Sequence, residues 1–198
     1  MTAKTNDALN PPVTEQELAD FAALPTGDDP AVNGVLIAAT SMVIRFLERD
    51  LVARDWVLTL WDWPYVGTRS FPEVSRRNSY LSREIALPFA NLLSVDSVEL
   101  YGQQVTNFIE RDDSIVLPEG AQFERYKDNT DPAIKVSYRA GYGETAEEVP
   151  KAVRQGILMM VALMYETRGD CDASQALIRS GASELLAPFA SPRKMAVM

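Results

Sequence analysis

The pattern of hydrophobic and polar positions predicts two long helices, one near each end of the chain. Hydrophobic residues between Val32 and Leu47 recur at steps of three and four, which is typical of a helix with one apolar stripe. Asp29 and Pro30 precede them. An Asp side chain can accept a hydrogen bond from the first turn of a helix and proline is favoured at the first helical position, so this pair predicts the start of that helix. The second long helix is predicted from Val149-Pro150, and it contains nine consecutive hydrophobic residues, Ile157 to Tyr165. A helix that is apolar on all sides has to be covered on all sides, so this run predicts the central helix of the domain, a subunit contact, or both.

Shorter helices are predicted beside the two long ones. Thr14 and Glu17 have the spacing of a capping box, in which each side chain caps the backbone of the other residue, so a short helix is expected from residue 14. A last helix is predicted from Ala173 to Ala187, where Pro188 ends it. Residues 1–13 are polar and proline-containing, and they predict a flexible lead-in.

The middle of the chain has the pattern of short strands. Trp56 to Trp63 is aromatic and prone to form a strand, whereas Thr68 to Arg83 is polar and predicts a loop. Further short apolar runs are separated by turn residues, at 85–87, 95–101, 108–111, 114–117, 122–126 and 136–139. Strands at this spacing are typical of antiparallel sheets. The expected fold is therefore α+β, with a helical core at 14–54 and 150–188, an inserted antiparallel β-rich region at 55–143, and a tail at 189–198.

Composition narrows the functional classes. The 198 residues carry a formal charge of −9, which argues against tight binding of nucleic acid over a broad basic surface. Cys171 is the only cysteine, so an intramolecular disulfide is excluded and a reducing compartment such as a cytoplasm is expected. The first residues lack the apolar run of a signal peptide, and no segment is expected to reach transmembrane length.

Candidate chemistry is sparse. The chain has no histidine, which excludes serine–histidine and cysteine–histidine catalysis and every histidine-containing metal site. The acidic pairs, such as Asp112-Asp113 and Glu147-Glu148, fall at predicted turns, where solvated side chains are the usual explanation. We therefore expect no catalytic residue, no cofactor and no metal. Two alternatives stay open: a small carboxylate-based, metal-dependent enzyme, and a ligand- or peptide-binding module that uses Trp56, Trp61 and Trp63.

Two sets of residues are candidates for protein contacts. The first lies in the second long helix and is expected in the core or at a subunit interface: Ile157, Met160, Val161 and Met164. The second lies in the tail, where basic and apolar side chains follow a helix stop in an otherwise acidic protein: Phe189, Arg193, Lys194, Met195 and Val197. A terminal segment of this kind is typical of a docking peptide.

Several short segments, in their order along the chain, resemble one family. They are Ile85–Pro88 with Leu93–Val98, Val136–Tyr142, Val149–Val153, Tyr165–Arg168 and Leu185–Phe189. Their order and spacing, from about residue 24 to residue 193, are similar to those of the head–tail connector proteins of long-tailed phages and related gene-transfer particles. No single motif is specific, but their succession is.

The resemblance implies a structural adaptor and no enzyme. Connectors of this family form a ring, usually of twelve copies, under the portal protein, where they extend the DNA channel and join the capsid to the next head-completion (stopper) or tail protein. The resemblance implies that double-stranded DNA passes through without specific binding, that no membrane is involved, and that the tail docks on the portal. The expected location is the head–tail junction of a virion assembled in the cytoplasm of a bacterial host.

Overall fold

The computed structural model describes residues 2–5, 7–22, 29–66, 80–81, 83–89, 91–119, 131–167 and 170–191. The chain divides into two compact units. The β unit comprises Met1–Asn6 and Asp55–Arg139, and the helical unit comprises Asp7–Arg54 and Ala140–Met198. Helices at both ends of the chain and antiparallel strand pairs between them confirm the predicted α+β fold.

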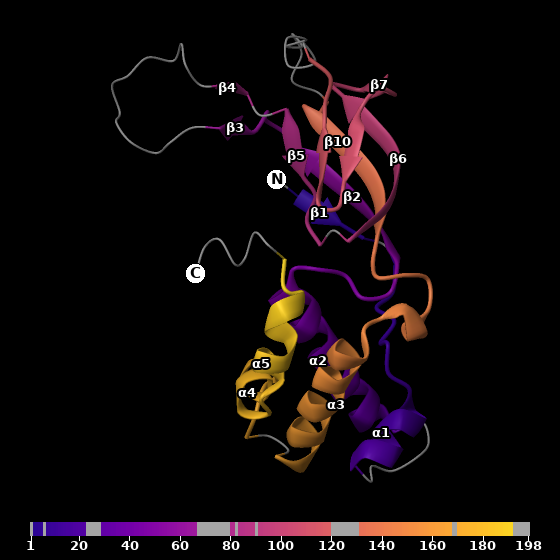
Figure 1. The fold of residues 1–198 in the computed structure, drawn as a ribbon, viewed down its shortest axis with the longest axis vertical. Coiled ribbons are helices and arrows are strands. Elements are labelled where there is room, and N and C mark those ends of the chain that lie inside the picture. Colours follow the sequence, from indigo (N-terminus) through magenta and orange to yellow (C-terminus); the bar gives the residue numbers. More distant parts are fainter. Residues whose placement is uncertain are drawn as a thin grey trace, which may run out of the picture. The chain divides into compact units, whose positions relative to one another are not determined.

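The helical unit contains five α-helices and two short 3₁₀ turns among its described residues (Figure 1). They are α1 (Glu15–Ala22), α2 (Pro30–Leu47), η2 (Ala146–Glu148), α3 (Lys151–Glu166), α4 (Ala173–Arg179), α5 (Ala182–Leu186) and η3 (Ala187–Phe189). The predicted start signals act as expected. The Asp29 carboxylate accepts a hydrogen bond from the Ala31 N–H at 2.9 Å, and the Glu17 carboxylate accepts one from the Thr14 N–H at 2.9 Å.

Helix α3 is the centre of the helical unit. It packs against α1, α2, α4 and α5. Figure 1 shows α1 on one side of α3 and α4 with α5 on the other. The residues of α3 that are buried recur at steps of three and four: Val153, Gly156, Ile157, Met160 and Val161. Glycine at position 156 lets the Leu186 side chain of α5 approach closely, because a Cβ there would lie 3.1 Å from it.

The predicted last helix is two helices instead of one. Gly181 has a φ of 77°, a left-handed conformation that interrupts the helical backbone between α4 and α5. The sequence pattern predicts that the helix continues through Ser180, Gly181 and Ala182. In the structure it is interrupted there. The small side chains at this point allow the chain to turn back over α3.

The β unit is built on a five-stranded sheet in the order β1-β2-β10-β6-β7. These strands are β1 (Thr2–Lys4), β2 (Arg54–Leu60), β10 (Ile134–Ala140), β6 (Leu92–Leu100) and β7 (Gln103–Val105). A second sheet has the order β5 (Glu84–Ala86), β9 (Ser114–Val116), β8 (Ile109–Arg111), and β3 (Tyr65–Val66) pairs with β4 (Tyr80–Leu81). Every second residue of β10, from Ile134 to Ala140, is fully buried, as expected for a central strand.

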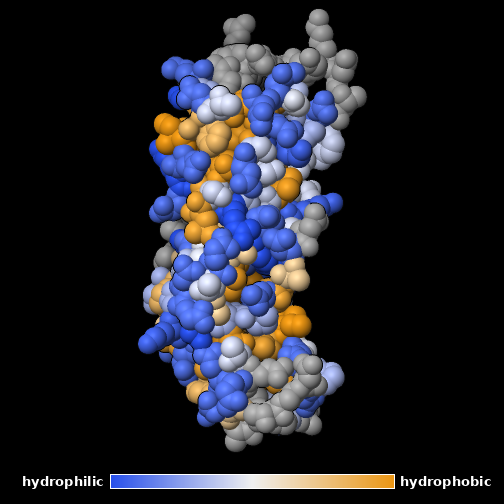
Figure 2. Space-filling view, turned by 90° about the vertical axis from the view of Figure 1, so that its right-hand side faces the viewer, coloured by the Kyte–Doolittle hydropathy of each residue, from blue (hydrophilic) through white to orange (hydrophobic). Residues whose placement is uncertain are grey.

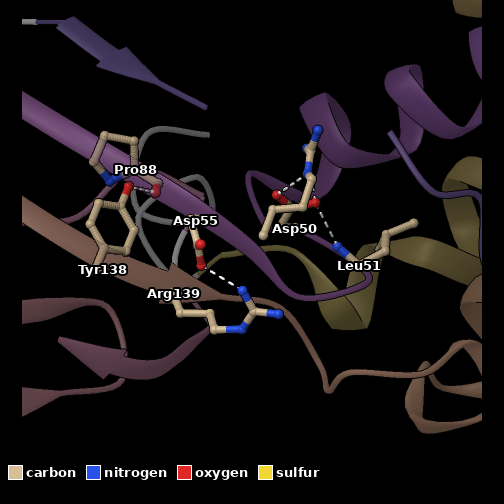
Figure 3. A network of polar contacts seen from close by, with 7 residues as sticks. Asp50, Leu51, Asp55, Pro88, Tyr138 and Arg139 are labelled. Carbon is tan, nitrogen blue, oxygen red and sulfur yellow. Dashed lines mark hydrogen bonds and ion pairs between the residues drawn. The ribbon is translucent and has the colours of Figure 1, made fainter. Parts of the chain in front are cut away.

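Polar contacts fix the segments where the chain passes from one unit into the other (Figure 3). Within the β unit, Arg139 forms an ion pair with Asp55 at 2.5 Å, and the Tyr138 hydroxyl donates to the Pro88 carbonyl at 2.5 Å. Within the helical unit, the buried Asp50 carboxylate accepts from the Arg54 guanidinium at 2.7 Å and from the Leu51 N–H at 3.0 Å.

Backbone hydrogen bonds join residues 51–53 to residues 142–143, the two segments of the helical unit that lead to and from the β unit. The Ala53 N–H donates to the Gly143 carbonyl and the Tyr142 N–H to the Leu51 carbonyl, both at 2.8 Å. A Cβ at position 141 would lie 2.6 Å from the Ala53 nitrogen, so this crossing requires glycine.

Some strands differ from the sequence prediction. Residues 2–4 pair with β2 instead of forming part of a flexible lead-in over residues 1–13. β7 lies where a turn was expected, and β4 lies inside the predicted loop at 68–83. β2 ends at Leu60, so Trp61 and Trp63 lie beyond the strand to which they were assigned. The strand predicted at 122–126 lies outside the described residues.

Candidate assembly surfaces

The structure places the candidate residues of α3 inside the helical unit. Ile157, Met160 and Val161 are fully buried, and Met164 is half-buried. All nine residues from Ile157 to Tyr165 are described, and none of them is exposed. Three of the nine are buried and six are half-buried, so the chain's own helices bury part of the run, and its role as a subunit contact stays a prediction.

The candidate tail begins later than the sequence suggested. Phe189 is the last residue of η3 and is half-buried, and Ala190 and Ser191 are buried against the helical unit. The Ser191 N–H donates to the Leu47 carbonyl at 2.8 Å, at the end of α2. Residues 189–191 thus belong to the helical unit, not to the tail at 189–198. The other four candidates, Arg193, Lys194, Met195 and Val197, lie outside the described residues.

Helix α2 carries a surface that the sequence analysis missed. One face of α2 packs into the helical unit through Val32, Leu36, Ala39, Thr40, Val43, Ile44 and Leu47. The residues on the opposite side are exposed or half-buried, and we call them the α2 open face: Gly34, Ile37, Ala38, Ser41 and Met42. Ile37 is 47% exposed, and no atom lies within 4 Å of the position that a Cβ on Gly34 would occupy.

The composition of α2 is unusual for a helix with an open face. No charged residue occurs from Pro30 to Ile44, and Arg45, in the last turn, is the one charge of the helix. The expectation that no segment is long and apolar enough for a membrane is wrong for α2. Its 18 residues, with a mean hydropathy of 1.5, meet that test by length and composition alone. Core helices meet the same test, and α2 packs against α3 and α4.

Other large hydrophobic side chains are exposed on both units. In the helical unit they are Phe21 on α1, 44% exposed, and Ile178 on α4, 69% exposed. In the β unit they are Trp61, Leu93 and Ile109. Figure 2 shows one face of the molecule, on which small hydrophobic areas interrupt a mostly hydrophilic surface.

The three tryptophans do not form one exposed site. Trp56 is buried and stacks on Phe89 with ring centroids 4.8 Å apart, and Trp63 is also buried. Only Trp61 is exposed, at 58%. Two of the three residues therefore pack in the β unit, which is the commoner use of such side chains.

The described part of the helical unit has an ion pair between Arg54 and Asp50 and another between Arg154 and Glu17. A pocket of about 240 Å³ is lined by Glu17, Lys151, Arg154, Gln155 and Leu158, and Arg154 forms an ion pair with Glu17 across it. Burial raises the pKa of the Tyr142 hydroxyl, and the nearby Arg49 guanidinium partly offsets this. Within the described ranges, no three His, Cys, Asp or Glu side chains are grouped so that they could hold a metal ion.

Comparison with known proteins gives matches at the level of structure. No protein-family model and no curated protein sequence matches the chain. A chain in the structure titled "Neck of native GTA particle computed with C12 symmetry" has a TM-score of 0.67 and 18% identity, with 96% of each chain covered. The fold is that of a gene transfer agent neck protein.

Two further structures extend this result. A chain of the neck of the empty particle, computed with C6 symmetry, has a TM-score of 0.65 and 18% identity, and the match covers 91% of this chain and 95% of that one. A chain of the native gene transfer agent virion has a TM-score of 0.65 and 18% identity, with 90% and 94% covered. The resemblance to connector proteins of phages and gene-transfer particles is thus confirmed for the fold.

Proposed function

We propose that this protein is a structural component of the head–tail neck of a gene transfer agent or tailed-phage particle, where its copies form a ring under the portal. The observation that carries the proposal is the match over almost the whole of both chains to a neck protein in a twelvefold arrangement. Both units take part in the match, because 96% of this chain is covered. The function is mechanical: the ring joins the capsid to the next head-completion or tail protein.

A ring requires surfaces that bind copies of the same chain. In a closed ring each copy contacts one neighbour through one patch and the other neighbour through a different patch. The neck structures with sixfold and twelvefold symmetry support this type of assembly. The exposed hydrophobic residues on α1, α2 and α4 support it as well, since such side chains are the usual anchors of protein interfaces.

The charge of the chain suits a channel through which DNA passes without binding. With 28 acidic and 19 basic residues the protein repels phosphate on average, so duplex DNA would not be held in place. Specific recognition would instead need basic side chains grouped on one face.

The tail is proposed to dock on the portal. Ser191 fixes its starting point at the end of α2, and Arg193, Lys194, Met195 and Val197 follow within six residues. Apolar side chains in pockets would supply most of the affinity, and the two basic side chains would orient the segment on an acidic rim.

The ring is tested by producing the chain together with the portal of the same particle. Native mass spectrometry and electron microscopy of the purified complex are expected to show twelve copies on one face of the portal ring. A chain that remains monomeric and elutes separately from its portal would overturn the proposal.

The tail is tested separately by deleting residues 193–198, which keeps the Ser191 anchor. The variant should melt at the same temperature as the full chain and should lose binding to the portal in a pull-down. A matched variant, with Met195 and Val197 replaced by serine and both basic residues kept, should lose most of the binding if the apolar side chains supply the affinity. Wild-type binding by the deletion variant would place the docking surface elsewhere.

A further inference from the structure

The α2 open face is an uncharged helical surface in the described part of the helical unit, and Gly34 and Ile37 on it are exposed. A helix face in contact with water normally carries charged side chains, and α2 has none before Arg45. Ala38, Ser41 and Met42 continue this face and are half-buried. Apolar surface that a helix leaves open to water often marks a contact site. Gly34, Ala38 and Ser41 are small, so the backbone of another element can approach this face closely.

The ring proposed above supplies an occupant for this face, namely a second copy of the chain. Because the two patches of a ring contact differ, the α2 open face has to meet another surface of the neighbour. The described part of the helical unit exposes two large hydrophobic residues outside α2, Ile178 on α4 and Phe21 on α1. α4 packs on α2 within the same copy, whereas α1 packs on α3 and lies on the opposite side of α3 from α4 (Figure 1).

The charges also favour α1 as the complementary surface. Asp20 is exposed beside Phe21, and its carboxylate accepts a hydrogen bond from the Gln16 amide at 2.9 Å. The α2 open face ends at Arg45, which is exposed in the last turn. One surface therefore offers an aromatic ring next to an acid, and the other offers an apolar face next to a base.

We propose that the α2 open face of each copy receives Asp20 and Phe21, on α1, of the next copy in the ring. The Phe21 ring packs on Ile37 and Ala38, and the Asp20 carboxylate pairs with the Arg45 guanidinium. This inference rests on the proposed ring, and it names α1 and α2 as the helices through which neighbouring copies make contact. The apolar contact supplies the affinity, and the charge pair sets the register of neighbouring copies.

Cross-linking tests the contact on the assembled protein. Phe21→Cys and Ile37→Cys are introduced together into a Cys171→Ser background, and the complex with the portal is treated with a short bismaleimide. The expected result is a ladder of covalent oligomers on a denaturing gel, while either cysteine alone gives monomers. If portal-bound rings form but the double variant yields only monomers, the contact is wrong and the proposed function is untouched. If the wild-type chain stays monomeric with its portal present, both are wrong.

Gly34→Leu separates assembly from folding. No atom lies within 4 Å of the Cβ position, so the single chain should fold and melt at or above the wild-type temperature. In the ring the leucine would hold the neighbour's α1 away, and ring formation should need at least about tenfold more protein, as expected for the loss of a packed interface core. Ring formation at the wild-type concentration would contradict the proposal.

A charge exchange tests the register. Arg45→Asp and Asp20→Arg should each weaken assembly several-fold, and the double variant should recover it, because the pair is restored with its charges reversed. If the double variant does not recover assembly, Asp20 and Arg45 do not form a pair between copies.

The membrane alternative is tested with the wild-type chain and phosphatidylcholine–phosphatidylglycerol vesicles. Flotation of the chain with the vesicles would assign the face to lipid and overturn the proposal, whereas recovery of the chain in the unbound fraction supports it.

Discussion

Helices α2 and α3 are the two longest of the described helices, and both are rich in hydrophobic residues. They differ in what covers them. α3 packs against four other helices, and no residue from Ile157 to Tyr165 is exposed. α2 packs mainly on α3 and α4, and its other side exposes Gly34 and Ile37. The helix that is hydrophobic all round has neighbours from its own chain on several sides, whereas α2 leaves Gly34 and Ile37 exposed, where the proposed ring would place another copy.

This difference changes what a substitution on each helix should do. On α3 a poorly suited side chain disturbs the core, so stability is lost together with assembly. At the exposed positions of the α2 open face, Gly34 and Ile37, the same side chain has room within the chain, so stability should be kept and assembly lost. Matched pairs of substitutions on the two helices therefore test the distinction directly.

The largest effect is expected from a buried charge. Met160 is fully buried, and Met160→Glu would place a carboxylate among apolar side chains at a cost of several kcal/mol, comparable with the total stability of a domain. We expect Met160→Glu to lack cooperative thermal unfolding by circular dichroism. Ile37→Glu on the α2 open face is the matched control, because Ile37 is 47% exposed, and it is expected to fold normally and fail to form rings. A Met160→Glu variant that melts close to wild type would show that α3 is not the core helix.

A smaller difference is expected when a side chain is shortened. Ile157→Ala leaves a cavity under a fully buried residue and should lower the free energy of unfolding by about 2–4 kcal/mol. Ile37 is 47% exposed, so Ile37→Ala should change the free energy by less than about 0.5 kcal/mol and weaken assembly instead. Urea unfolding of the isolated chains gives both values. Equal losses at the two positions would contradict the contrast between the helices.

The smallest effect concerns the glycine in each helix. Gly34→Ala should stabilise the chain by about 0.5–1 kcal/mol, because alanine favours the helix and nothing lies near the added methyl group. Gly156→Ala gains the same preference but places its Cβ 3.1 Å from the buried Leu186 side chain, so its net effect should be smaller or unfavourable. A greater stabilisation at position 156 than at 34 would mean that the packing of α5 on α3 is looser than described.

The sequence predicted the elements whose ends carry specific chemistry. Asp29-Pro30 and Thr14 with Glu17 marked helix starts that the structure has within one residue. The central strand β10 was predicted because its apolar residues alternate. β1 and β7 were missed because Thr2–Lys4 and Gln103–Val105 carry no apolar pattern, and each is held at a sheet edge by backbone pairing to a neighbour. The break at Gly181 was missed because glycine within a short polar run does not reveal whether its φ is positive.

The candidate surfaces were less predictable than the fold. The run from Ile157 to Tyr165 is recognisable in the sequence because it is continuous, but its burial depends on how many helices pack around it, which is a tertiary property. The signal of α2 was present in the sequence as the absence of charge from Pro30 to Ile44. The spacing of the hydrophobic residues predicts which side of α2 is buried, but it does not show what covers the uncharged opposite side. The predicted tail begins at Phe189 because Pro188 ends a helix. The hydrogen bond from the Ser191 N–H to the Leu47 carbonyl keeps residues 189–191 on the helical unit.

The most direct test of the central claim is a structure of the ring assembled on its portal, determined by electron microscopy at a resolution that shows side chains. The account predicts that Gly34, Ile37 and Ala38 of one copy lie against Phe21 of the next, and that Ile157 to Tyr165 contact only their own chain. An α2 open face that points to solvent or into the channel, or a contact between copies made through α3, would contradict it.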